Sequence, residues 1–205
     1  SESYNREFSD VFAIQADIAI NVANAMETTL SEEEIASISR PASESTEAYT
    51  LLLETRWQQD AENALMSLDE DGWIMAGVER MERAVELDPF FARGIAELGF
   101  LKVVSGELSP SENRHKLFDE GISYANRAIE LDPNIGRAYQ VLQIVALERR
   151  QWDEWYRYAR KALEFPDPDG RAAFNFALDL ISISQFKKGY QWLDVAISKE
   201  PSLVV

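Results

Sequence analysis

The sequence predicts an all-α fold in which antiparallel helix pairs stack side by side as an α-solenoid. The first observation is a recurring phrase: GVERMERAVELDP spans Gly77–Pro89, and GISYANRAIELDP spans Gly121–Pro133. Weaker copies occupy residues 155–167 and 189–201. The second observation is the spacing of the alanine at the centre of each copy. These alanines are Ala84, Ala128, Ala162 and Ala196. The last three are equally spaced, and the interval from Ala84 to Ala128 is longer. A fixed period of about 34 residues is typical of repeats that stack to bury their apolar faces.

Residues 1–40 precede the repeats and are predicted to form a separate helical segment. Apolar residues recur at steps of three and four between residues 8 and 30, which indicates one helix. Ser31 and Glu34 form a capping box, which begins a short second helix. Pro41 disfavours helical geometry at the preceding residue, so a linker follows. We expect this segment to cap the first repeat or to be the tail of an upstream domain.

Residues 41–205 are predicted to hold four helix pairs. Their approximate limits are 46–91, 92–135, 136–169 and 170–203. The first pair is expected to have helices over about 47–66 and 73–87, separated by an acidic turn. In three of the four repeats a proline ends the second helix, because proline lacks the backbone N–H and clashes with the preceding turn.

Two pairs are longer than this period. The second carries ten extra residues around Gly106–His115, and the first carries about twelve within Asp60–Gly72. Both insertions fall between the two helices of a pair. They therefore either lengthen those helices or form loops at one edge of the stack.

Small and large residues occupy fixed positions within the repeats. In the second repeat Leu98 is large, while Gly99, Gly121 and Ala128 are small. Small residues let the two helices of a pair approach closely, and large residues fill the gaps that remain. Over residues 46–201 this pattern resembles the tetratricopeptide repeat. The resemblance implies a right-handed superhelix in which the first helix of each pair lines a concave groove that binds a protein or peptide.

The N-terminus carries a second pattern, Tyr-x-Arg-x-x-x-Asp-Val-Phe-x-Ile-Gln. The residues that match this pattern are Tyr4, Arg6, Asp10, Val11, Phe12, Ile14 and Gln15. Ile18 and Ala19, which follow the pattern, match the same segment. The segment resembles one that joins a TolB-like domain to tetratricopeptide repeats in bacterial regulatory proteins and class III adenylate cyclases. The resemblance implies that this chain is the C-terminal repeat region of a larger bacterial signalling protein, with any cyclase domain upstream.

The composition argues against several classes of function. The formal net charge is −16, and an acidic surface repels nucleic-acid phosphates. The chain has no cysteine and a single histidine, His115, which supports neither a metal site nor a catalytic triad. No apolar run reaches the roughly 18 residues that cross a bilayer. We expect no enzyme activity, cofactor, metal or membrane insertion in this chain, and a cytoplasmic location is favoured over a periplasmic one.

The candidate binding residues lie on the first helix of each pair, at positions that line the groove in the resembling family. Arg93, Arg137 and Arg171 share one repeat position and would form a basic ladder. Guanidinium groups bind carboxylates with two hydrogen bonds, so an acidic peptide is a fitting ligand. The alternative is that each arginine pairs with an acid of the preceding turn. The remaining groove candidates are Ala96, Phe100, Gln140, Ile144, Phe174 and Leu178.

These patterns predict a non-catalytic scaffold whose partner is a protein, a peptide or another domain of the same chain. Two other classes of function stay open. A homo-oligomer would form if the repeats or the N-terminal helix pair between chains, and a small-molecule sensor would bind a metabolite instead. Trp152 and Trp155 share a helix face and are predicted to pack in the core, since Trp155 stands where other repeats have glycine.

Overall fold

A computed structural model describes residues 16–26, 29–32, 35, 42–65, 70–165 and 171–199, without the side chains of 60–65, 70, 71, 111 and 171. All the regular structure in these residues is helical, and they contain no β-strand. The predicted all-α class is therefore confirmed.

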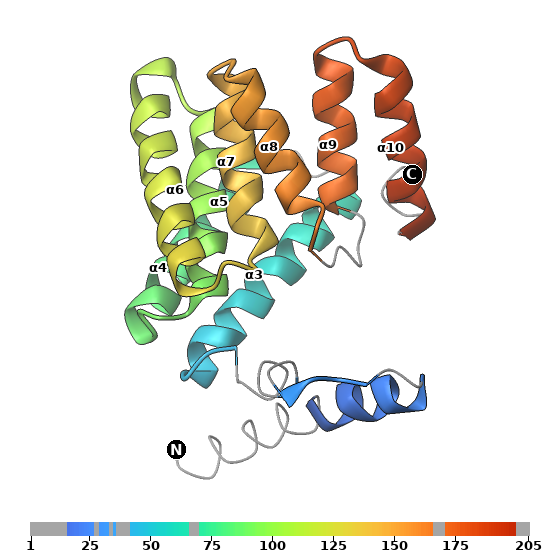
Figure 1. Cartoon of the computed structure of the whole chain (residues 1–205). Helices are drawn as coiled ribbons and strands as arrows, with labels where there is room; N and C mark the ends of the chain where they lie inside the picture. Colours follow the sequence, from blue (N-terminus) through green and yellow to red (C-terminus); the bar gives the residue numbers. More distant parts are fainter. Residues whose placement is uncertain are drawn as a thin grey trace.

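The helices follow one another in pairs that lie side by side (Figure 1). The pairs are α3 (Thr46–Leu65) with α4 (Glu70–Leu87), α5 (Ala92–Leu108) with α6 (Ser111–Leu131), α7 (Gly136–Glu148) with α8 (Trp152–Ala162), and α9 (Arg171–Ser182) with α10 (Phe186–Lys199). In Figure 1, α3 runs obliquely to the helices that follow it. The predicted limits of the first pair agree with these bounds to within three residues.

The insertion in the second pair lengthens its helices. Here α5 has 17 residues and α6 has 21, whereas α7 has 13 and α8 has 11. Only Ser109 and Pro110 separate α5 from α6. In the first pair, α3 likewise continues to Leu65 and α4 begins at Glu70, so most of that insertion is helical as well.

The turns inside the last two pairs have the same conformation. Arg150 and Ser184 have φ values of 57° and 63°, in the left-handed region that non-glycine residues rarely adopt. The amide after each of them donates to a carbonyl five residues back, as in Gln151 N to Ala146 O at 2.8 Å. This hydrogen bond and the left-handed residue form the Schellman motif that ends many helices. The two turns are separated by one period of the sequence, the same interval that separates Ala162 from Ala196.

Glycines allow the two helices of a pair to approach closely. A Cβ atom on Gly121 of α6 would lie 3.0 Å from the carbonyl oxygen of Gly99 in α5. A Cβ atom on Gly189 of α10 would lie 3.0 Å from the carbonyl oxygen of Ala177 in α9. Both glycines are therefore needed because backbone, which cannot move aside cheaply, occupies the space of a side chain. The pair α7–α8 differs, since its close position holds the buried Trp155.

The apolar core connects neighbouring pairs. One cluster joins α3 and α4 to α5 through Leu52, Met81 and Leu98. A second joins α5 and α6 to α7, and a third joins α7 and α8 to α9. Each of the first three pairs therefore buries apolar side chains against the pair that follows it.

The described part of the N-terminal segment includes a helix over residues 16–25. Ile18, Val22 and Met26 recur every fourth residue and are 57%, 52% and 73% exposed. This stripe is therefore not buried against the first repeat. Most of the predicted second helix, and most of the N-terminal pattern that carries the second resemblance, lie outside the described residues.

Candidate functional site

The three arginines of the predicted ladder have different environments. Arg93, near the start of α5, is exposed and makes no hydrogen bond or ion pair with any residue that the structure describes. The side chain of Arg137 in α7 is only 13% exposed and is held by an ion pair. Arg171 begins α9, and its side chain lies outside the described part of the chain. Arg93 and Arg137 are thus not equivalent groups, and of these two only Arg93 is free for a ligand.

Arg137 belongs to a cluster of charged side chains that spans three helices. Its centre is Glu97 of α5, whose side chain is fully buried. Glu97 Oε2 accepts hydrogen bonds from Arg56 Nε of α3 at 3.3 Å and from Arg137 Nε at 3.1 Å. The guanidinium of Arg137 also lies 4.1 Å from the ring centre of Phe100 and donates to Gln140 Oε1 at 3.2 Å. One carboxylate therefore ties α3, α5 and α7 together.

This cluster carries a net positive charge. Two guanidinium groups face one carboxylate, and Glu97 Oε1 is buried with no hydrogen-bond partner among the described residues. The side chain of Arg56 is 43% exposed, and within the described structure only its Nε is hydrogen-bonded. Arg93 stands four residues before Glu97 on α5, so the two lie on one helix face. The three arginines place local positive charge on a protein of net charge −16.

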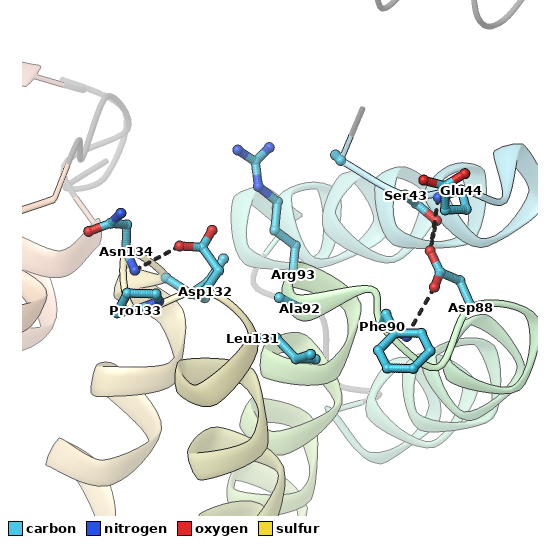
Figure 2. Close-up of a pocket in the computed structure, with 12 residues that line it drawn as sticks. Ser43, Glu44, Asp88, Phe90, Ala92, Arg93, Leu131, Asp132, Pro133 and Asn134 are labelled. Atoms are coloured by element: carbon cyan, nitrogen blue, oxygen red, sulfur yellow. Dashed lines mark hydrogen bonds between the residues drawn. The ribbon is translucent and has the colours of Figure 1, made fainter. Parts of the chain in front are cut away.

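A pocket of about 540 Å³ opens beside Arg93 (Figure 2). It lies where the chain passes from one pair to the next, at the starts of α5 and α7. Figure 2 shows the Arg93 side chain between the turn at Asp132–Asn134 and the wall made by Ser43, Glu44 and Asp88. The lining is completed by Ala42, Phe90, Ala92, Leu131, Pro133 and Ile135.

Hydrogen bonds to two aspartates shape the pocket walls. Asp88 is buried, and its carboxylate accepts from the Ser43 hydroxyl at 2.6 Å and from the amides of Glu44 and Phe90 at 2.9 and 3.0 Å. Asp132 accepts from the Asn134 amide at 2.9 Å. Both aspartates fix turns by bonding an amide two residues on. Neither of them pairs with Arg93, so within the described residues the guanidinium has no partner in the pocket.

The remaining predicted groove residues divide by burial. Ala96, Phe100 and Gln140 are buried, so they offer a ligand little surface. Ile144 and Phe174 are half-buried, and Leu178 of α9 is 46% exposed. Leu178 is therefore the apolar member of this set that is most open to solvent.

A second polar cluster lies where α7, α8 and α9 meet. Asp179 Oδ2 accepts from Gln143 Nε2 at 2.6 Å and from Trp155 Nε1 at 2.7 Å. Burial raises the pKa of Asp179, while these two hydrogen bonds lower it in part. The prediction that both tryptophans pack in the core is confirmed for Trp155, which is 5% exposed, and is wrong for Trp152, which is 50% exposed. The indole of Trp155 thus fills the place of a glycine and anchors the last pair.

Glu107, at the end of α5, lies close enough to this cluster to interact with it. Desolvation, followed by the negative charges of Glu148 and Asp179, raises the pKa of Glu107 to about 7, while Arg114 opposes the change. Arg114 donates to the Glu107 carbonyl at 3.0 Å and lies 3.7 Å from Glu148 Oε2. Glu107 itself keeps an exposed surface, so solvent screens part of the repulsion and the effect on stability is smaller than the pKa implies.

Because the pKa of Glu107 is higher in the folded chain, stability is expected to fall as pH rises from about 4.5 to about 7. Asp179 acts in the same direction. The variant Glu107→Gln removes the first contribution, so it should be more stable than the parent near pH 8 and lose this advantage near pH 5. Thermal unfolding of both proteins across this range measures the difference. A difference that does not change with pH would contradict the expectation.

Sequence reasoning missed Arg56 and Glu97. Glu97 lies among apolar and small residues in GIAELGFL, and a lone acid in such a run is a signal for a buried, paired charge. Its first partner, Arg56, is 41 residues earlier in the chain, and no local pattern connects the two.

No group of three or more metal-ligating side chains occurs in the part of the chain that the structure describes. Within the same residues, no helix is both long and apolar enough to cross a membrane. No protein-family model matches this sequence, and no curated protein is significantly similar to it.

Proposed function

We propose that this chain is an α-solenoid of the tetratricopeptide type and a non-catalytic scaffold for protein interaction. Three observations support the assignment. The alanines of the last three repeats are equally spaced, and the left-handed turns at Arg150 and Ser184 are separated by the same interval. Glycines bring α5 close to α6 and α9 close to α10. The helices follow one another as pairs whose cores join each pair to the next.

The proposed ligand is an acidic peptide segment with an apolar residue beside the acid. The observation that carries this proposal is the guanidinium of Arg93, which no described residue pairs with, in a pocket next to the cluster around Glu97. A carboxylate of the ligand would take two hydrogen bonds from Arg93. Phe90 and Leu131, which are 76% and 39% exposed, would contact the adjoining apolar side chain. Arg56 adds positive charge that attracts the same segment.

The segment belongs either to another protein or to another domain of the same polypeptide. The N-terminal pattern from Tyr4 to Gln15 supports the second source, because it resembles a linker that follows a regulatory domain in bacterial signalling proteins. In that setting the scaffold would bind an acidic region of its own parent or of a partner and so couple the two.

The test uses labelled 12-residue peptides in which Asp or Glu lies beside Leu or Phe, together with the same peptides with Lys in place of the acid. Fluorescence anisotropy should show binding of the acidic peptides only. Arg93→Glu is expected to weaken this binding at least tenfold, since it replaces an attraction by a repulsion. Arg160→Glu is the matched control, because Arg160 is also exposed and unpaired among the described residues but lies on α8. Equal losses in the two variants, or none in Arg93→Glu, would overturn the proposal.

A further inference from the structure

The last helix, α10, carries an apolar stripe that nothing in the described chain covers. Phe186 and Tyr190 are 53% and 58% exposed, and Leu193 and Ile197 continue the stripe as half-buried residues. The four recur at steps of three and four, so they share one face of the helix. Gly189 and Ala196, which are buried, occupy a different face of α10. The stripe therefore lies beside the contact with α9, not within it.

The corresponding face of an earlier helix is covered. Phe118 lies three residues before Gly121, as Phe186 does before Gly189, and Ile122 corresponds in the same way to Tyr190. Phe118 is 3% exposed and belongs, with Ile122 packed against it, to the core cluster that includes residues of α7. On α6 this face therefore contributes to the junction with the next pair. On α10 the same face has no described pair beyond it.

A helix with a matching stripe is present in the same chain. Ile18, Val22 and Met26 lie on one face of the N-terminal helix and are all more than half exposed. Both stripes extend over two to three helical turns, so they can pack along one another. Charge favours the contact as well. The exposed basic residues of α10 are Lys187, Lys188 and Lys199, against one acid, Asp194, whereas residues 16–26 hold one acid, Asp17, and no base.

We propose that residues 16–26 of one copy, which comprise the helix 16–25 and Met26, dock on the Phe186–Ile197 stripe of α10 in a second copy. Within a single chain, the N-terminal helix, blue in Figure 1, lies apart from α10, and both stripes stay exposed. Reciprocal docking covers both stripes in each copy. It gives a closed dimer with two-fold symmetry, the commonest form of homo-oligomer.

The test measures the mass of the full chain by light scattering over a range of concentrations. The parent is expected to approach the mass of a dimer as concentration rises. Ile18→Asp with Val22→Asp, or Tyr190→Glu alone, should raise the dissociation constant at least tenfold. Val195→Asp is the matched control, because Val195 is also exposed on α10 but lies on another face. Circular dichroism confirms that each variant keeps its helices.

Mixing the two kinds of variant makes the test specific. The Ile18→Asp/Val22→Asp copy keeps an intact α10, and the Tyr190→Glu copy keeps an intact N-terminal helix, so the mixture should regain part of the dimer that neither forms alone. Higher salt should weaken the association, since opposite charges contribute to it. A parent that stays monomeric at its highest soluble concentration would overturn the proposal, as would a dimer unchanged by Tyr190→Glu. Arg93 takes no part in this contact, so peptide binding and dimer formation can fail independently.

Discussion

Replacing Phe91 by alanine is expected to lower the free energy of unfolding by about 3–5 kcal/mol. Phe91 is 0% exposed and packs in the core cluster that joins α3 and α4 to α5, with its ring centre 6.3 Å from that of Tyr49. Its removal leaves a cavity at the junction between the first two pairs, where the surrounding backbone is held by the hydrogen bonds of Asp88 and cannot close the gap. Urea-induced unfolding followed by circular dichroism measures the loss.

The neighbouring residue provides the control. Phe90 is the same amino acid one position earlier, yet it is 76% exposed and lines the pocket beside Arg93. Phe90→Ala is expected to change the stability by no more than about 0.5 kcal/mol, as is usual for surface substitutions. It should weaken the binding of acidic peptides that carry an apolar residue. Similar losses of stability in the two variants would contradict the placement of these rings.

Sequence patterns predict where α4 ends but do not predict which of these two phenylalanines is buried. The Leu-Asp-Pro phrase predicts that α4 ends near Leu87, and α4 does end there. Which of the two rings enters the core depends on the path of the turn. That path follows from the bonds that Asp88 makes to the Phe90 amide and to Ser43, which is 45 residues away in sequence. A contact over such a distance leaves no local signal.

The conformation of the two insertions could not be predicted from the sequence for a similar reason. Ten extra residues between two helices are compatible with a loop or with about three more helical turns, since each turn takes 3.6 residues. The structure has the longer helices, and α6 begins at Ser111, just after Pro110. The repeat period, by contrast, predicted the order of the helices and where each pair begins, because it depends on the spacing of small and apolar residues along the chain.

The candidate site was predicted in part. Repeat position alone placed Arg93 and Arg137 on the first helices of their pairs, which is where both lie. It could not separate a free guanidinium from a buried one. That difference arises because Glu97 lies between α3 and α7 and pairs with Arg137, whereas Arg93 makes no ion pair with any acid among the described residues. The difference between the two arginines thus depends on one carboxylate from the middle of an apolar helix.

Replacing this carboxylate, as in Glu97→Leu, is expected to destabilise the fold by about 3–5 kcal/mol, because it leaves a buried arginine without its partner. The two arginines should respond differently. The side chain of Arg56 is 43% exposed and can turn to solvent, whereas that of Arg137 is 13% exposed and cannot. Urea-induced unfolding of the parent, Glu97→Leu, Arg137→Leu and the double variant gives the four free energies of unfolding that make up a double-mutant cycle.

The cycle should give a coupling energy of about 0.5–3 kcal/mol, the range for side chains in contact. The double variant is then expected to be more stable than the sum of the single losses predicts, because the apolar pair leaves no charge unpaired near Phe100. Arg56→Leu with Glu97→Leu should give a smaller coupling, since water already solvates part of Arg56. Additive losses in the first cycle would show that Glu97 and Arg137 do not stabilise one another. The distinction between Arg93 and Arg137 would then depend on their exposure alone and not on the ion pair.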